Sequence, residues 1–409
     1  MTSLSSSRMT DIKIIALVCI PHMLSHVYWL VIPPMFPILM SVYDLNYTQV
    51  GAIMTAFAAA TSIAQTPIGF LVDKIGARTV LIFGLAIEGL AIAGFGFSTS
   101  YWQLVLLAVV AGLGHTVFHP ADYAILSSKI SEKRMGRAFS VHSATGYLGF
   151  AIAPVFMTGV SQLWHWRASF ILIGLVGILA ALVLVSQMKI LGDKKNASAD
   201  RSSGTETASN TDEMGFTSGI RLLVSLPVLM CFLYFVLHQM GGGGVRTFLV
   251  AVLNELYGTP EILAAFALSA FTIGSVVGIL SGGYVADRFG PRVTTAVFTL
   301  VPASVIIALL GWIDVRGFLL VFLLAIAGYL IGLLIPSRDL LLRSVTPAGS
   351  MGKVMGFAST GSNIGGALIP VILGYAMDNI GGQWVFWISA VFIAAAFLTF
   401  VTARTKYGA

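Results

Sequence analysis

Long apolar runs separated by short polar segments occupy most of this chain from residue 14 onward. Each run is long enough to cross a bilayer as a helix, which takes about 20 residues. The runs fall at residues 14–34, 49–71, 79–97, 102–126, 137–160, 167–187, 222–250, 262–285, 294–313, 317–342, 354–376 and 383–403. Helices are expected because an open strand edge would leave backbone groups unpaired in hydrocarbon. The pattern predicts an all-α membrane protein with twelve transmembrane helices in a lipid bilayer.

A polar segment divides these runs into two sets of six. Residues 189–221 are rich in Ser, Thr, Asp, Lys and Asn and contain few large apolar side chains. Such a composition cannot bury a core, so the segment reads as a solvated linker. The predicted domains are an N-terminal six-helix bundle at 1–188, a cytoplasmic linker at 189–221 and a C-terminal six-helix bundle at 222–409.

One short motif occurs at the same place in both halves. The sequence GFLVDKIGAR at 69–78 aligns without a gap with GYVADRFGPR at 283–292. A pattern kept in both halves indicates a duplicated unit. We therefore expect two six-helix halves of one topology, related by a pseudo-two-fold axis along the membrane normal.

Composition and charge agree with a membrane protein. The chain is 57% hydrophobic and only 10% charged, whereas soluble domains are about 25% charged. The net charge of +6 does not suggest a nucleic-acid partner, because basic residues lie at span ends and not in one patch. Only Arg167, Arg246 and Arg316 of the 23 Lys and Arg residues fall toward the outer side if the amino terminus is inside. The positive-inside rule then places both termini in the cytoplasm and the protein in the cell (inner) membrane.

Several kinds of site are not expected. Cys19 and Cys231 both lie inside apolar runs, where single thiols behave as small hydrophobes, so neither a disulfide nor a metal site is predicted. The sequence shows no Walker-type loop, metal-ligand cluster or nucleophile triad. We expect no catalytic residue and no cofactor, which argues against an ATP-driven pump or a membrane hydrolase. The polar amino terminus lacks a small-residue cleavage site, so the first run is read as a retained span.

Twelve spans, a central linker and two copies of the loop motif resemble the major facilitator superfamily along almost the whole chain. Within that family, the sequence GLGHTVFHP at 112–120 is similar to the fosmidomycin-resistance branch, as are Ser25-His26 and Gln65-x-Pro67. The resemblance implies a monomeric transporter that works by alternating access on a small-molecule substrate. Departures fall in helices that would face the cavity: Ala121 stands where this branch has an acid, and Trp29-Leu30 replaces an Asn-Asp pair.

The resemblance also implies a gating role for the repeated motif, which would lock the cytoplasmic side when the cavity faces outward. The residues expected to gate are Asp73, Arg78, Asp287 and Arg292. The alternative is a topology signal only, but that needs positive charge and not an aspartate between two glycines. Arg338 and Asp339, adjacent near the cytoplasmic end of the tenth span, are also assigned to the gate. Neighbours on a helix point about 100° apart, so each is expected to have a different partner.

Polar residues present in only one half are better candidates for substrate binding and coupling. His115, His119 and Asp122 share one helical stripe in the fourth span, and Ile331 and Ile335 stand at the positions matching the histidines. An ionisable group at mid-membrane costs about 2.5–3.5 kcal/mol, so it normally faces a cavity or a partner. Histidine titrates near neutral pH, which suits proton coupling. The alternative is a pair of neutral histidines that hydrogen-bond to neighbouring helices.

Three further histidines and one glutamate extend this set of candidates. His22 and His26 lie four apart in the first span, and His238 matches His26 in the second half. By resemblance these spans line the central cavity, so His26 and His238 are expected to meet near the midplane; interhelical hydrogen bonding is the alternative. Glu88 lies near the middle of the third span. If unpaired it would be protonated, which makes it a candidate second proton site.

The seventh span contains four consecutive glycines, Gly241 to Gly244. They predict a hinge or an unwound segment, because glycine disfavours a stiff helix; close helix packing is the alternative. Arg246 follows immediately. It is predicted either to bind an anionic substrate group bidentately or to snorkel toward the membrane surface.

Together these patterns predict a proton-coupled secondary active transporter for a small organic solute, plausibly an organic anion. One alternative is a drug/proton antiporter that exports a fosmidomycin-like antibiotic. An alternative from another class is a membrane receptor or channel on the same scaffold.

Overall fold

The computed structural model describes residues 2–130, 132–191, 221–290, 292–347 and 351–405. Its first half contains α1 (Thr2–Trp29), η1 (Pro33–Met35), α2 (Phe36–Tyr43), α3 (Tyr47–Ile75), α4 (Ala77–Phe95), α5 (Tyr101–His115), α6 (Phe118–Lys129), α7 (Glu132–Leu163), α8 (Trp166–Ser186) and α9 (Met188–Leu191). Its second half contains α11 (Leu226–His238), η3 (Gln239–Gly243), α12 (Gly244–Tyr257), α13 (Glu261–Phe289), α14 (Val293–Leu309), α15 (Gly317–Ser344), α16 (Met351–Ile380) and α17 (Gln383–Thr405). The described residues form helices and turns without a strand, which confirms the all-α prediction. Most of the predicted linker lies outside the described residues.

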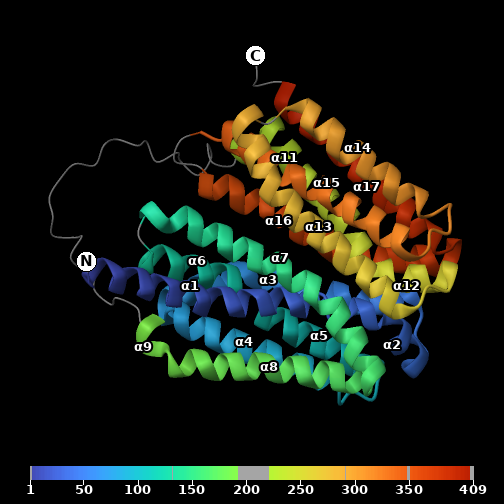
Figure 1. Ribbon diagram of the computed structural model, residues 1–409, viewed down its shortest axis with the longest axis horizontal. Coiled ribbons are helices and arrows are strands. Elements are labelled where there is room, and N and C mark those ends of the chain that lie inside the picture. The colour runs from blue at the N-terminus through green and yellow to red at the C-terminus, as the bar shows by residue number, and fades with distance from the viewer. Residues whose placement is uncertain (1, 131, 192–220, 291, 348–350, 406–409) are drawn as a thin grey trace.

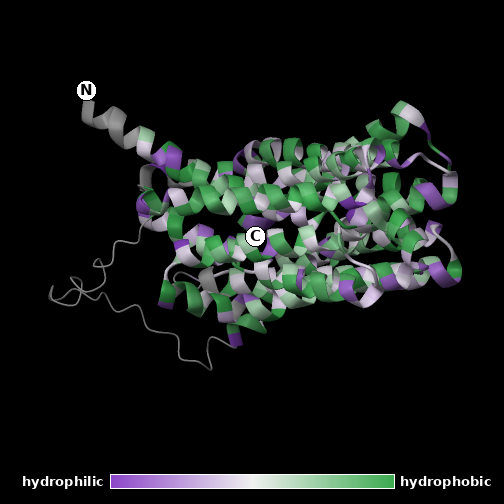
Figure 2. Ribbon diagram, turned by 90° about the horizontal axis from the view of Figure 1, so that it is seen from below, coloured by the Kyte–Doolittle hydropathy of each residue, from purple (hydrophilic) through white to green (hydrophobic). Residues whose placement is uncertain are grey.

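These elements make six crossings in each half. Ten helical segments of the described chain are long and apolar enough to cross a membrane. Three of these segments each consist of more than one consecutive element: the first runs from α1 to α2, the second contains α5 and α6, and the third runs from α11 to α12. The 29-residue α3 and the 17-residue apolar α14 complete the set, since a span takes about 17–25 residues. Figure 2 shows hydrophilic residues gathered in the loops at the ends of the helices.

The two halves form separate bundles that touch through a few helices. Figure 1 shows α1 to α9 as one bundle and α11 to α17 as the other. Contacts between the bundles come mainly from α3 against α16 and from α7 against α13. The bundles converge at the end that holds α2 and α12, and they diverge toward the end that holds the amino terminus. We call the convergent end the outer end, after the predicted orientation.

Side chains from both bundles close this outer end. The Asp378 carboxylate of α16 accepts hydrogen bonds from the backbone N–H groups of Tyr47 and Thr48 at 2.9 and 2.8 Å, and from Thr48 Oγ1 at 2.5 Å. The N–H groups in the first turn of a helix have no carbonyl partner within that helix, so those of Tyr47 and Thr48 are available to Asp378. On the other side of the interface, Ser269 Oγ donates to the Ala151 carbonyl at 2.7 Å. The outer contacts are therefore specific polar contacts as well as apolar packing.

The repeated motif forms equivalent turns in the two bundles. Gly76 ends α3 with φ 94°, and Gly290 ends α13 with φ 66°. Both angles lie in the left-handed region, which glycine adopts without a steric penalty. The backbone conformation thus explains why the second glycine of the motif occurs in both copies.

Candidate transport site

A buried carboxylate with two imidazoles lies between α1, α6 and α7 in the first bundle. Asp122 of α6 is 0% exposed, and His142 Nε2 of α7 hydrogen-bonds to its Oδ2 at 3.0 Å. His22 Nδ1 of α1 lies 3.1 Å from the same oxygen, without the alignment of a hydrogen bond. The His22 and His142 rings stack with centroids 3.6 Å apart. We call these three residues the Asp122 cluster.

A glycine lets α1 and α7 approach closely enough to build this cluster. Gly146 lies one turn after His142, and a Cβ placed on it would come within 2.8 Å of the Nε2 atoms of both His22 and His26. Any larger residue would therefore push these imidazoles away from α7. The glycine is needed for packing against histidines of α1.

The Asp122 cluster has residue types that could ligate a metal ion. Its three donor atoms lie within 4.8 Å of one another. However, the two rings lie almost parallel, at 24°, so their in-plane lone pairs do not converge on one point as tetrahedral metal ligands require. Both imidazoles instead approach a single carboxylate oxygen. This arrangement suits a shared proton better than a metal ion.

A second buried pair lies apart from the Asp122 cluster. Glu88 of α4 is 0% exposed, and its Oε1 lies 2.9 Å from His115 Nδ1 at the end of α5. Trp29 and Phe57 pack on the His115 ring at centroid distances of 5.1 and 5.3 Å. Glu88 is therefore paired, because His115 turns toward α4 and provides its partner. A role of Glu88 as a second proton site stays a prediction.

The predicted stripe of His115, His119 and Asp122 does not form one site. Helix α5 ends at His115 and α6 begins at Phe118, so the regular helical spacing is broken between them. His115 then faces Glu88, while Asp122 faces α1 and α7. His119 is exposed, with its ring centroid 5.5 Å from that of His22. The fourth crossing thus contributes His115 to one buried pair and Asp122 to another, and the exposed His119 lies between them in the sequence.

His142 was not among the residues predicted for the site. It is 1% exposed and completes the Asp122 cluster. The sequence carried a signal for it, because Ala358 stands at the matching position of the second half. The same comparison between halves that selected His115 and His119 would have selected His142.

Arg246 points into the protein. Its Nη2 donates to Gln239 Oε1 at 3.2 Å, and its guanidinium carbon lies 5.8 Å from the ring centroid of Phe150 in the other bundle. Of the two predictions for Arg246, this geometry contradicts snorkelling toward the membrane surface. Bidentate binding of an anionic group stays a prediction.

The glycines before Arg246 are helical, so of the two forms predicted for this segment the unwound one is wrong, while a hinge stays a prediction. The turn at Gln239–Gly243 is a π-helix that joins α11 to α12 without a break, and such turns are frequent at functional sites. Gly241 packs against Ile393 and Ser389 of α17, where a Cβ would come within 2.6 and 2.9 Å. Close helix packing, the alternative reading, accounts for this glycine.

His26 and His238 each contact a different aromatic ring. His26 lies against Phe150, with ring centroids 4.4 Å apart. His238 stacks on Tyr234, with centroids 5.5 Å apart, and its Nδ1 lies 3.5 Å from the tyrosine hydroxyl. The expected meeting of His26 with His238 is not among the ring contacts of the described residues.

Arg338 and Asp339 do bond to each other, which corrects the expectation of separate partners. Arg338 Nε and Nη2 donate to Asp339 Oδ1 at 2.9 and 2.7 Å. The long arginine side chain reaches around the helix, so the 100° offset of the two Cα–Cβ bonds does not keep the charged ends apart. Its guanidinium also lies 4.2 Å from the Phe235 ring centroid.

The motif residues show contacts within their own bundle. Arg78 Nη1 donates to the Met188 carbonyl at 3.0 Å, which ties the start of α4 to the start of α9. Asp287 and Arg292 are exposed, and Arg292 lies over Phe289 at 5.5 Å. Asp73 lies in α3, but its side chain is outside the described residues. Gating by this motif stays a prediction.

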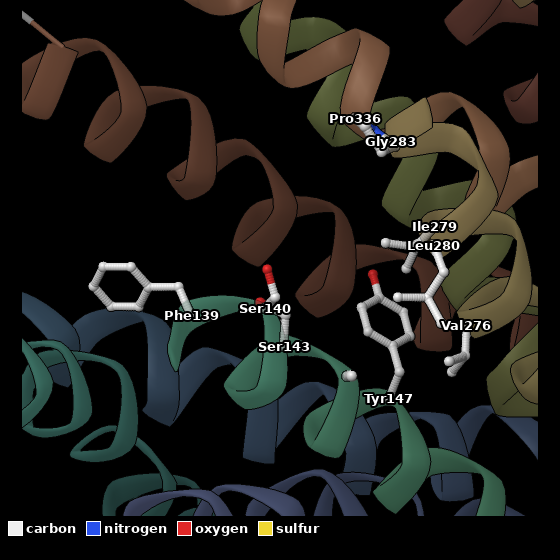
Figure 3. Close-up of a pocket in the computed structure, with 10 residues that line it drawn as sticks. Phe139, Ser140, Ser143, Tyr147, Val276, Ile279, Leu280, Gly283 and Pro336 are labelled. Carbon is white, nitrogen blue, oxygen red and sulfur yellow. The ribbon is translucent and has the colours of Figure 1, made fainter. Parts of the chain in front are cut away.

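A cavity of about 380 Å³ lies between the bundles. Figure 3 shows α7 on one side of it and α13 on the other. The lining residues are Phe139, Ser140, Ser143, Ala144, Tyr147, Val276, Ile279, Leu280, Gly283 and Pro336. All of them belong to α7, α13 or α15. Its volume is in the range of sites that bind small molecules.

The chain is similar to known transporters along almost its whole length. It is 26% identical to the uncharacterized transporter YfnC of Bacillus subtilis, covering 95% of this chain and 91% of YfnC. It is 23% identical to the fosmidomycin resistance protein of Escherichia coli, covering 95% and 92%. It is 24% identical to the probable sulfoacetate transporter of Cupriavidus necator, covering 90% and 87%.

The fold and a family model lead to the same assignment. An inward-facing, unoccupied bacterial homologue of the human lysosomal transporter Spinster matches with a TM-score of 0.79 at 16% identity, covering 98% of this chain and 99% of that one. The model of the Major Facilitator Superfamily matches residues 18–264 and 231–408. The chain is therefore a multi-pass membrane protein that belongs to the major facilitator superfamily and transports a small solute.

Proposed function

We propose that this protein is a proton-coupled secondary active transporter for a small organic anion in the cytoplasmic membrane. It works as a monomer by alternating access, with both termini in the cytoplasm according to the positive-inside rule. In that orientation the bundles are closed outside and diverge inside. The Spinster homologue that matches this fold was solved in an inward-facing conformation, which supports the same assignment for this structure.

The Asp122 cluster is the observation that carries proton coupling. An ionised Asp122 with one protonated imidazole is neutral as a group, and one proton more or less leaves a net charge. A net charge in a low-dielectric interior is costly unless water or a partner compensates it. A change of conformation that alters access to water will therefore change the preferred number of protons. Coupling then follows because each conformation favours its own protonation state.

Arg246 is the observation that favours an anionic substrate. Among the described residues, its side chain makes a hydrogen bond to the neutral Gln239 and forms no ion pair with a carboxylate. A guanidinium inside a membrane protein normally pairs with a charge or lines a wet cavity. A carboxylate or sulfonate of the substrate would supply that charge through a bidentate contact. The relative named as a probable sulfoacetate transporter would carry such an anion.

Purified protein in proteoliposomes tests this function. A panel of monocarboxylates, dicarboxylates, sulfonates and phosphonates is first screened for thermal stabilisation. The stabilising compounds are then added outside vesicles that hold an imposed pH gradient, and the internal pH is followed with a dye. We expect substrate-dependent collapse of the gradient and accumulation that stops when the gradient is removed. Uptake that ignores both pH and voltage would contradict proton coupling and favour a channel or a facilitator.

Export of a fosmidomycin-like antibiotic is the second candidate function, because the fosmidomycin resistance protein aligns over 95% of this chain. Fosmidomycin belongs in the phosphonate arm of the same panel. Stabilisation by fosmidomycin, with efflux from loaded vesicles against its gradient, would favour export over uptake of a metabolite.

Replacing Glu88 with Gln should move the pH dependence of uptake without abolishing it. Glu88 is buried and its Oε1 lies 2.9 Å from His115 Nδ1, so this pair has two groups that can hold a proton. The glutamine amide cannot ionise, so the pair loses one proton site and the midpoint of the pH profile of uptake should move. Initial uptake rates between pH 5 and 8 measure the shift. Glu255→Gln, at an exposed position of α12, serves as the control; an unshifted profile in Glu88→Gln would remove the pair from the coupling mechanism.

A further inference from the structure

The cavity between the bundles has two walls of different chemistry. The α7 wall carries the hydroxyl groups of Ser140, Ser143 and Tyr147. Figure 3 shows the Tyr147 hydroxyl pointing away from α7 toward Ile279 of α13. The α13 wall carries the aliphatic side chains of Val276, Ile279 and Leu280. One bundle thus offers hydrogen bonds to a bound molecule, while the other offers only apolar surface.

Phe150 connects Tyr147, at the cavity, to Arg246 of the second bundle. Tyr147 and Phe150 are neighbours on α7, with ring centroids 6.0 Å apart, and the Arg246 guanidinium lies 5.8 Å from the Phe150 centroid. An anionic group is therefore best placed near Tyr147, with the remainder of the molecule between the α7 and α13 walls.

We propose that this cavity selects an organic anion with an apolar body over a polyhydroxylated acid of the same size and charge. The inference rests on the proposed function and adds the substrate class. An aliphatic or aromatic body covers Val276, Ile279 and Leu280 and removes apolar surface from water. A polyhydroxylated acid instead presents hydroxyl groups to that wall, where they lose water without gaining a hydrogen bond. The serine and tyrosine hydroxyls accept or donate toward one polar face of the bound molecule.

Hexanoate and gluconate test the inference, because both are monocarboxylates with six carbons and they differ in their hydroxyl groups. Affinities are measured on the full-length protein in detergent by calorimetry or by thermal stabilisation. We expect hexanoate to bind at least about tenfold more tightly than gluconate, the discrimination typical of a pocket that recognises apolar groups. Equal affinity, or tighter binding of gluconate, overturns the inference.

Two neighbouring valines of α13 provide a matched pair of variants. Val276 lines the cavity, whereas Val277 is 52% exposed on the outside of the helix. Threonine has nearly the shape of valine but adds a hydroxyl. Val276→Thr should weaken hexanoate binding about fivefold to tenfold and leave gluconate binding unchanged or improved. Val277→Thr should leave both affinities unchanged; equal effects of the two variants overturn the inference.

The variant Arg246→Gln separates this inference from the proposed function. If gluconate binds more tightly than hexanoate and both need Arg246, the anion transporter stands and only the apolar preference is overturned. If no anion in the panel binds, the proposed function fails and this inference fails with it. If hexanoate binds equally well in Arg246→Gln, the site is a nonspecific lipid-like groove, which also overturns the inference.

Discussion

Asp122→Asn is expected to abolish proton-driven accumulation of substrate while exchange of substrate across the membrane continues. The amide cannot ionise, and it leaves His22 and His142 without the carboxylate oxygen that both approach at 3.1 and 3.0 Å. The cluster then lacks its ionisable carboxylate. Coupling to the pH gradient is lost, so the concentration ratio at steady state should fall to one.

Exchange should persist because it needs the conformational change and not the proton. Where opening and closing limit turnover, the counterflow rate should stay within about threefold of the unmodified protein. The measurements are accumulation under an imposed pH gradient and counterflow of labelled against unlabelled substrate, in the same vesicles. Retained counterflow also shows that the variant is folded.

Asp44→Asn is the control for this substitution. Asp44 is exposed in the turn after α2 and has φ 53°, a conformation that asparagine tolerates well. It should leave accumulation and counterflow unchanged. If Asp122→Asn still accumulates substrate like the unmodified protein, Asp122 does not carry the coupled proton, and the Glu88–His115 pair becomes the remaining buried candidate.

The arrangement of spans was predictable because the membrane imposes strong and simple constraints. A crossing needs a long apolar run, and the runs at 49–71 and 294–313 correspond to α3 and α14. The motif turns were predictable for a similar reason, since Gly76 and Gly290 need positive φ angles. Both features depend on local sequence and on the bilayer, so one chain contained enough information.

The partners inside the site were much less predictable, because they depend on how each helix is rotated against its neighbours. The break between His115 and Phe118 redirects one imidazole to Glu88, and no periodicity in the sequence predicts this break. Likewise, the pairing of Asp122 with His142 joins α6 to α7 through packing and not through spacing. Arg338 differs, because the Cα–Cβ directions of neighbouring residues were estimated correctly. Its long flexible side chain nevertheless reaches Asp339.

Asp378→Ala is expected to shift the protein toward conformations that are open at the outer end. In this structure the Asp378 carboxylate of α16 accepts three hydrogen bonds from Tyr47 and Thr48 at the start of α3. A carboxylate at a helix amino terminus is also favoured by the helix dipole. This contact joins the two bundles, so it stabilises only the conformation in which their outer ends meet.

The expected size of the shift follows from the value of a helix cap. Losing such a carboxylate costs about 0.5–2 kcal/mol, and 1.4 kcal/mol corresponds to about tenfold in an equilibrium. The ratio of outward-open to outward-closed molecules should therefore rise about tenfold. Asn379→Ala is the matched control, because the Asn379 amide donates to Tyr375 within its own helix.

Spin labels at the outer ends measure this equilibrium directly. Val42→Cys on α2 and Ile380→Cys on α16 place labels at exposed positions of the two bundles, in a background that carries Cys19→Ala and Cys231→Ala. Asp378→Ala should increase the population with the longer distance between the labels, and Asn379→Ala should not. An unchanged distance distribution would mean that the other contacts between the bundles, including the packing of α3 on α16 and the Ser269–Ala151 hydrogen bond, are enough to close the outer end. The hydrogen bonds of Asp378 to the start of α3 would then result from closure of the outer end and would not help to cause it.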